Sequence, residues 1–172
     1  MRSSNGKLLF WWVLISVVVV DFITKRLAVA YLSSGAFPIL RPSLVLRLVY
    51  NPGAAFGIHV GDYSRWVFMV LALVALVVLG AMVRQTLPTQ RFRLLTLGLV
   101  CGGAVGNLLD RIRSPQGVVD FIDVWIGKFH WPTFNVADMA VSCGAIALAL
   151  VLWSEGEKTA TEESVHPAEA SP

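Results

Sequence analysis

The sequence predicts an all-α membrane protein: four transmembrane helices, with a small β-containing segment outside the membrane between the first and second helices. Two observations predict the helices. The 172 residues are 56% hydrophobic and only 15% charged, and the apolar residues form four long blocks instead of amphipathic stripes. A third observation predicts the β segment, where PSLVLRLVY is rich in Leu and Val and is bounded by Pro42 at its start and Pro52 just beyond its end.

The four blocks cover residues 8–32, 66–83, 92–109 and 136–153. Each of the last three has about 18 residues, which as a helix is about 27 Å long and close to the thickness of a hydrocarbon core. The first block has a second interpretation, a cleavable signal peptide ending at Ala28-Val29-Ala30. The charged run DFITKR interrupts the block before that site, which favours a retained helix.

Four spans place both termini on the same side of the membrane. Arg84, Arg91 and Arg93 crowd the short link between the second and third blocks, which predicts that this link and both termini are cytoplasmic. Residues 33–65 and 110–135 then lie outside. Residues 1–153 form one four-helix domain, and the Glu-rich residues 154–172 are expected to be a disordered cytoplasmic tail.

Small residues at fixed spacing predict close helix packing. Gly98, Gly102 and Gly106 lie four apart on the third block, and Ala140 and Gly144 form a similar patch on the fourth. This spacing is more typical of packing than of a site, but it brings the outer ends of the two helices together.

Several classes of function lack their usual pattern. The basic residues flank apolar blocks and form no stripe, so we expect membrane lipid and no nucleic acid as a partner. The two cysteines indicate neither a disulfide framework nor a zinc site. His59, His130 and His166 lack ligand spacing, so no metal and no cofactor are expected.

Polar residues inside or beside the apolar blocks are candidate functional residues. Asp21 and Lys25 share a helix face, either as a structural ion pair with Lys25 snorkelling to the surface or as part of a site. Asn107 and Arg111 share a face at the outer end of the third block. The Arg111 guanidinium could hold a lipid phosphate, a carboxylate or peptide carbonyls, or could pair with one aspartate among Asp110, Asp120 and Asp123. The run NPGAAFG, residues 51–57, has the composition of a turn.

Two aspartates stand out when they are considered together. Asn135 and Asp138 at the start of the fourth block have a plain interpretation as helix caps, and Asp120 alone would most often be solvated. However, the topology places both aspartates at the outer membrane boundary. Two carboxylates at one site do not easily ionise together, so one keeps a proton while the other acts as a base. Such a pair can activate water against a peptide carbonyl.

Two other functions compete with hydrolysis. Intramembrane acids also mark proton paths, which would suit a small proton-coupled transporter or channel. A non-catalytic membrane scaffold would use the glycine faces for helix assembly and would tolerate Asp120→Asn and Asp138→Asn.

Five segments in order resemble the lipoprotein signal peptidase family, also called signal peptidase II. They are DFITK (21–25), NPGAAFG (51–57), GGAVGNLLDRI (102–112), VVDF (118–121) and FNVAD (134–138). The resemblance implies an aspartic endopeptidase of the bacterial inner membrane. It would remove the signal peptide from diacylglyceryl-modified prolipoproteins by cutting before the lipid-modified lipobox cysteine.

The resemblance also implies roles for single residues. The catalytic pair falls on Asp120 and Asp138, and the active site would lie near the outer leaflet. The remaining polar motif positions, expected to bind substrate or support the pair, are Asn51, Gly53, Asn107, Arg111, Asn135, Asp21 and Lys25. The oligomeric state is open, with a monomer favoured.

Overall fold

The computed structural model describes residues 5–40, 43–53 and 61–165. Its four long helices are α1 (Asn5–Leu32), α2 (Ser64–Gln85), α3 (Arg91–Arg113) and α4 (Val136–Val165). All four are long and apolar enough to cross a membrane. The four predicted spans are therefore confirmed, each lying within one of these helices.

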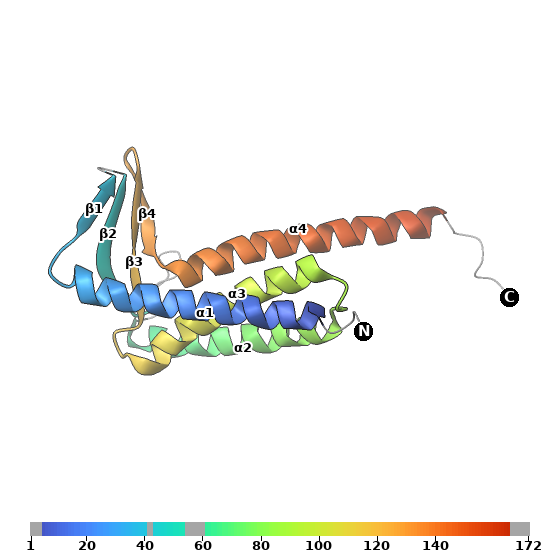
Figure 1. Ribbon diagram of the computed structural model, residues 1–172, viewed down its shortest axis with the longest axis horizontal. Coiled ribbons are helices and arrows are strands. Elements are labelled where there is room, and N and C mark those ends of the chain that lie inside the picture. Colours follow the sequence, from blue (N-terminus) through green and yellow to red (C-terminus); the bar gives the residue numbers. More distant parts are fainter. Residues whose placement is uncertain (1–4, 41–42, 54–60, 166–172) are drawn as a thin grey trace.

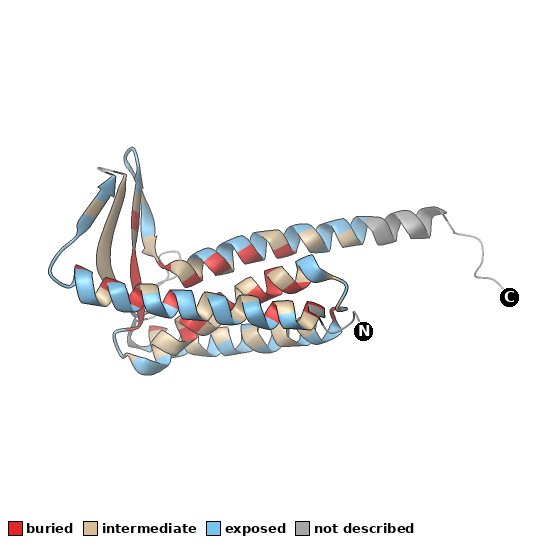
Figure 2. Cartoon of the chain, in the orientation of Figure 1, coloured by how far each residue is buried: buried red, intermediate tan, exposed pale blue. Residues whose placement is uncertain are grey.

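Helix α3 forms the centre of the bundle, and α1, α2 and α4 pack around it (Figure 1). The glycine face of α3 explains how α1 comes so close. A Cβ at Gly102 would lie 3.0 Å from the main-chain oxygen of Leu14, and one at Gly98 would lie 3.0 Å from that of Phe10. Figure 2 shows the result, with buried residues concentrated on α3 while α2 is buried only at Ser64. An apolar helix this exposed suits a lipid environment.

The sheet has four antiparallel strands in the order β1-β2-β3-β4, from β1 (Phe37–Leu40), β2 (Leu44–Asn51), β3 (Val118–Ile126) and β4 (Phe129–Phe134). The expected β segment between the first two helices is confirmed as β1 and β2. The sequence analysis did not predict β3 and β4, which come from the second outer segment and complete the same sheet. A short 3₁₀ helix, Gly61–Tyr63, precedes α2.

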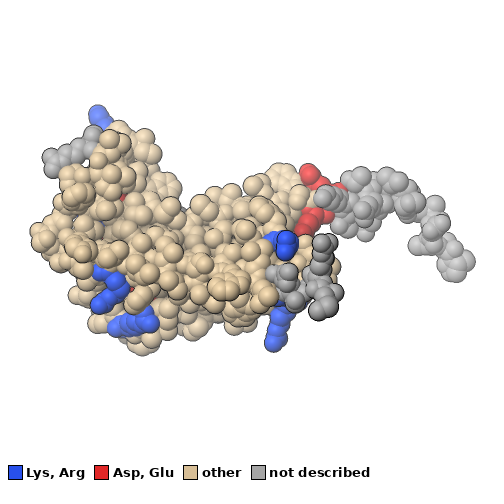
Figure 3. Space-filling view, in the orientation of Figure 1, with Lys and Arg blue, Asp and Glu red and all other residues tan. Residues whose placement is uncertain are grey.

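The sheet stands at one end of the bundle, while the start of α1, the α2–α3 link and the far end of α4 lie at the other end (Figure 1). Ala28 and Leu32 of α1 pack against Val119 and Phe121 of β3, which joins sheet and bundle. On the face shown in Figure 3, charged side chains gather towards the two ends of the molecule and the middle of the bundle carries none. This distribution fits a body that crosses a bilayer.

Helix α4 continues beyond the expected span. Residues 154–165, expected to be part of a disordered tail, are helical, and residues 166–172 lie outside the described residues. At the end of the bundle away from the sheet, Glu155 forms an ion pair with Arg93 of α3, with nitrogen and oxygen 2.9 Å apart. The first part of the expected tail is therefore packed against the bundle.

Candidate active site

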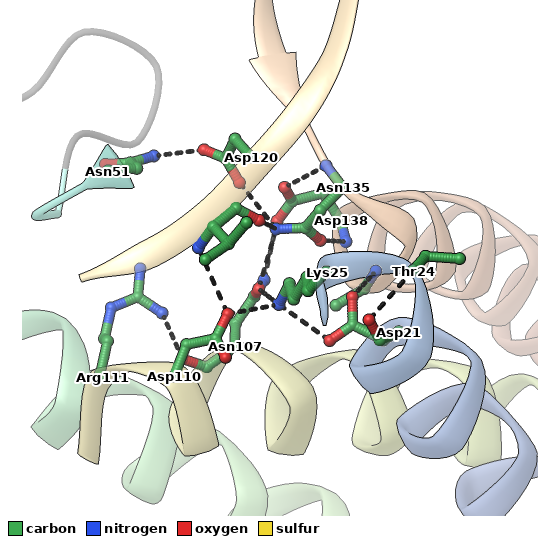
Figure 4. A network of polar contacts seen from close by, with 12 residues as sticks. Asp21, Thr24, Lys25, Asn51, Asn107, Asp110, Arg111, Asp120, Asn135 and Asp138 are labelled. Atoms are coloured by element: carbon green, nitrogen blue, oxygen red, sulfur yellow. Dashed lines mark hydrogen bonds and ion pairs between the residues drawn. The ribbon is translucent and has the colours of Figure 1, made fainter. Parts of the chain in front are cut away.

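The candidate site lies where the bundle meets the sheet (Figure 4). Helix α1 contributes Asp21 and Lys25, and α3 contributes Asn107, Asp110 and Arg111. Strand β2 ends at Asn51, and β3 carries Asp120. Asn135 directly precedes α4, and Asp138 lies in its first turn. Segments up to 116 residues apart in sequence are joined here by hydrogen bonds. All the sequence-predicted site residues except Gly53 appear in this view, together with Asp110.

Asn135 contacts both candidate catalytic aspartates. Its side-chain Nδ2 donates to Asp120 Oδ1 at 2.7 Å and to Asn107 Oδ1 at 3.1 Å. Its main-chain N–H donates to Asp138 Oδ2 at 3.1 Å. Asn135 is fully buried, so its amide has little freedom to rotate away from these partners.

The helix-cap interpretation of Asn135 and Asp138 is correct, and it coexists with their place in the site. The Asp138 N–H donates to Asn135 Oδ1 at 2.9 Å, so the two residues exchange hydrogen bonds in a capping box. Asp138 Oδ1 also accepts a hydrogen bond from Asn107 Nδ2 at 2.8 Å. The cap therefore holds the Asp138 carboxylate at the positive end of the α4 dipole.

Lys25 is buried in the bundle, so the interpretation in which it snorkels to the surface is wrong. Its ammonium lies 2.8 Å from Asp21 Oδ2 and 2.8 Å from Asp110 Oδ2. It also donates to Asn107 Oδ1 at 2.9 Å. Three acceptors match the three ammonium hydrogens, which offsets the cost of burying a lysine that is only 3% exposed.

The contact with Lys25 also orients Asn107. The Asn107 Oδ1 accepts from Lys25 and from Asn135, so its Nδ2 must point the other way, towards Asp138. Lys25 therefore acts on Asp138 through one intervening side chain.

Asp21 links α1 to the start of α4. Its Oδ1 accepts a hydrogen bond from the Ala137 N–H at 2.9 Å, which satisfies an amide in the first turn of α4. The close approach of Asp21 to α3 depends on Gly106, where a Cβ would lie 2.6 Å from Asp21 Oδ2. The ion pair expected between Asp21 and Lys25 is confirmed, and it supports the site.

Asp120 is only 2% exposed, so it is not the solvated side chain that its position in an outer loop would suggest. Burial raises the pKa of Asp120 to about 7, and the charge of Asp138 adds to this rise. Hydrogen bonds from Asn51 and Asn135, and the charge of Lys25, act in the opposite direction and lower the same pKa. Asp120 therefore titrates close to neutral pH.

Asn51 approaches Asp120 from the end of β2, with Nδ2 3.1 Å from Asp120 Oδ2. Its Oδ1 accepts from the Gly53 N–H at 3.0 Å, which makes the predicted turn at this point. Gly53 has a φ of 133°, and a Cβ there would lie 2.9 Å from Ser64 and Phe68. The rest of NPGAAFG, residues 54–57, lies outside the described residues.

Arg111 lies beside the network without an ion pair to any carboxylate of the described residues. The expected pairing with Asp110, Asp120 or Asp123 is therefore not found there. Its Nη1 donates to the Asn107 main-chain oxygen at 3.2 Å, and its guanidinium lies over the Phe68 ring. This leaves a cation next to the carboxylates, with donors available to a further partner.

Asp110, which the sequence analysis considered only as a partner of Arg111, also belongs to the site. It accepts from Lys25 and, at 3.3 Å, from the Val119 N–H, so it ties α3 to the residue before Asp120. The signal was its position three residues after Asn107, on the same side of the helix. Among the residues that the structure describes, no group of three His, Cys, Asp or Glu side chains is placed to hold a metal ion.

The fold and the site define a multi-span membrane protein with two carboxylates joined through the buried Asn135 at one end of its bundle. Comparison with known proteins makes the assignment more specific. A sequence model of the family described as signal peptidase (SPase) II matches residues 13–154. The chain therefore belongs to the signal peptidase II family, and its activity is that of a lipoprotein signal peptidase.

Individual relatives agree with this membership. A lipoprotein signal peptidase of Hydrogenovibrio crunogenus is 38% identical over 171 residues, covering 95% of this chain and 99% of the relative. One from Burkholderia mallei is 38% identical over 152 residues, covering 86% and 90%. A bacterial membrane enzyme solved by the in meso method at 2.3 Å resolution is 25% identical, with a TM-score of 0.76, covering 92% of this chain and 95% of that one.

Proposed function

We propose that Asp120 and Asp138 are the catalytic pair of this peptidase. They cleave a diacylglyceryl-modified prolipoprotein before its lipid-modified cysteine. The observation that carries this proposal is the contact of the buried Asn135 with both carboxylates, which joins the two side chains in one hydrogen-bond network. Two carboxylates arranged in this way can share one proton and divide the roles of acid and base between them.

The surroundings of the two carboxylates favour a division of roles. Asp120, with a pKa of about 7, holds a proton near neutral pH and donates it to the carbonyl oxygen of the scissile bond. Asp138 accepts hydrogen bonds from Asn107 Nδ2 and from the Asn135 main-chain N–H, so both of its carboxylate oxygens act as acceptors in this arrangement. Asp138 therefore takes the proton from the attacking water.

The proton balance closes in two steps. Water adds to the carbonyl carbon, its proton moves to Asp138, and the Asp120 proton moves to the carbonyl oxygen. When the tetrahedral intermediate collapses, Asp138 passes its proton to the nitrogen of the lipidated cysteine and the C–N bond breaks. Asp120 recovers its proton as the carbonyl re-forms, which leaves a carboxyl group on the signal peptide and a free amine on the lipoprotein.

The other predicted site residues support this pair. Lys25, Asp21 and Asp110 orient Asn107 and the start of α4, whereas Arg111 and Asn51 lie at the edge of the network where a peptide backbone could be held. Gly53 keeps the turn after β2 close to α2. We place the site at the outer leaflet of the bacterial inner membrane, with both termini cytoplasmic. Residues 1–153 form the peptidase domain, acting as a monomer in contact with membrane lipid.

The test is cleavage of a diacylglyceryl-modified lipobox peptide by the purified protein in detergent, with a chelator present. Asp120→Asn and Asp138→Asn are compared with Glu155→Gln, which removes a carboxylate at the opposite end of the bundle. The proposal expects cleavage by wild type and by the control, with each aspartate variant folded but reduced at least about 10³-fold. A folded aspartate variant with wild-type activity would remove that residue from the pair.

A further inference from the structure

A second group of charged side chains lies on the sheet, outside the candidate site. Arg47 on β2, Asp123 on β3 and His130 on β4 form this three-strand cluster. Asp123 is only 3% exposed, with Oδ1 2.5 Å from His130 Nε2 and Oδ2 3.0 Å from Arg47 Nε. The Arg47 Nε–H makes no hydrogen bond to the described residues, so its contact with Asp123 is an ion pair.

Two further contacts bind the cluster to its strands. Arg47 Nη2 donates to Thr133 Oγ1 at 3.2 Å, which connects β2 to β4 across β3. The Trp125 indole donates to Asp123 Oδ2 at 3.3 Å and stacks on the His130 ring, with centroids 4.3 Å apart. The cluster therefore joins three adjacent strands through one buried carboxylate.

The cluster lies where the pairing of the strands is irregular. The register between β2 and β3 shifts between Leu46 and Val49, the interval that contains Arg47. The register between β3 and β4 shifts between Ile122 and Val124, the interval that contains Asp123. At such irregularities the backbone ladder alone holds the register weakly, and a slip by one residue turns side chains to the opposite face.

The same three strands carry part of the candidate site. Asn51 ends β2, Asp120 lies on β3, and Asn135 directly follows β4. On each of these strands the register shift separates the site residue from the other end of the strand. The hydrogen bonds of 3.1 Å from Asn51 and 2.7 Å from Asn135 to Asp120 therefore depend on both registers.

We propose that Arg47, Asp123 and His130 are positioning residues for the peptidase reaction, which fix the register of β2, β3 and β4 so that Asn51 and Asn135 both reach Asp120. The inference rests on the proposed role of Asp120. The physical reason is that a buried carboxylate without its partners is strongly unfavourable, so only the register that brings Arg47 and His130 to Asp123 is stable.

The primary test is Asp123→Asn in the same cleavage assay, with Glu155→Gln as a control for loss of a distant ion pair. A shift of about 1 Å at a reacting group can cost up to about 100-fold in rate, so we expect kcat to fall at least about tenfold while KM changes about twofold or less. Weaker hydrogen bonds to Asp120 would also raise its pKa, so the high-pH limb of the kcat profile would move to higher pH. Asp138, Lys25 and Arg111 are the charged groups that interact with Asp120 in this profile.

His130 supplies a second test, which remains informative if Asp123→Asn does not fold. Gln can donate to Asp123 in place of the imidazole, whereas Ala cannot, so His130→Gln should retain kcat and the pH profile while His130→Ala loses kcat as Asp123→Asn does. Folded Asp123→Asn or His130→Ala with wild-type kcat and an unmoved pH limb would overturn the inference. If Asp120→Asn is active in this assay, the proposed catalytic pair fails instead.

Discussion

The Asn135 side-chain nitrogen lies 2.7 Å from Asp120 Oδ1, although Asn135 also caps the helix that carries Asp138. One buried residue thus caps the start of α4 and also donates a hydrogen bond to the carboxylate on β3. The two tasks use different atoms, because Oδ1 accepts from the Asp138 N–H while Nδ2 donates to Asp120. They can therefore be separated by substitution.

Asn135→Ser should remain folded and lose activity. Serine is about as good an N-cap as asparagine, so the start of α4 should keep its cap, but its short hydroxyl cannot reproduce the hydrogen bond to Asp120. We expect at least a tenfold loss of kcat/KM, to about 10% of wild type or less. Asn135→Ala, which removes cap and donor together, should also cost about 1 kcal/mol of stability. Equal activity of Asn135→Ser and wild type would contradict this role.

The rate should decrease as the pH rises above about 7, because burial raises the pKa of Asp120 to about 7 and the proposed mechanism needs its proton. Asn51→Ala removes a hydrogen bond that lowers this pKa, so its high-pH limb should lie at higher pH than that of wild type. A pH profile of kcat/KM checks both statements. A shift towards lower pH in Asn51→Ala would contradict the assignment.

Asp120→Asn should stabilise the folded protein at high pH. The pKa of Asp120 is about 7 in the folded protein against an ordinary value of 3.8, so the folded protein binds more protons between these values. This contribution to stability is present at low pH and is lost as the pH rises through about 7. The Tm of Asp120→Asn should therefore exceed that of wild type at pH of about 8, and the difference should shrink towards pH of about 5. A difference that does not change with pH would contradict the raised pKa.

Gly106→Ala should disturb the site, whereas Gly80→Ala should not. A Cβ at Gly106 would lie 2.6 Å from Asp21 Oδ2, but one at Gly80 would meet no heavy atom within 4 Å. We expect Gly106→Ala to lower Tm and activity together, since Asp21 must move away from the Ala137 amide. Gly80→Ala should raise helix stability by up to about 1 kcal/mol, because alanine is the better helix former. Thermal unfolding and cleavage assays of both variants check this contrast. Equal Tm and equal activity of the two variants would contradict the prediction.

Lys25→Met should destabilise the protein more than Asp110→Asn. Methionine leaves both Asp21 and Asp110 without their common cation, and breaking a buried pair in this way typically costs about 3–5 kcal/mol. Asparagine at position 110 can still accept from Lys25 and from the Val119 N–H through its side-chain oxygen. Thermal unfolding in detergent shows which variant is the less stable. A larger loss of stability in Asp110→Asn than in Lys25→Met would contradict the central position of Lys25.

The helices and the candidate residues were readable from the sequence, because both depend on local signals. A run of apolar residues long enough to cross a bilayer must become a helix there, since a helix satisfies its own backbone hydrogen bonds. The aspartates and asparagines were noticed because polar groups in or beside such runs are costly and need a partner. The caps at Asn135 and Asp138 were predictable for the same local reason.

The partners were decided by the tertiary structure. Strand β3 pairs on one side with β2, which comes from the other outer segment, so VVDFIDVWI was not recognised as a strand without its distant partner. Lys25 turns inward because Asp110 and Asn107 of another helix meet it, and Asp120 is buried because β2, β4 and α4 close around it. The sequence by itself determined which polar residues need partners and which segments span the membrane. Only the packing of segments far apart in the chain decided which groups meet, and the burial that this packing produces is what raises the pKa of Asp120 to about 7.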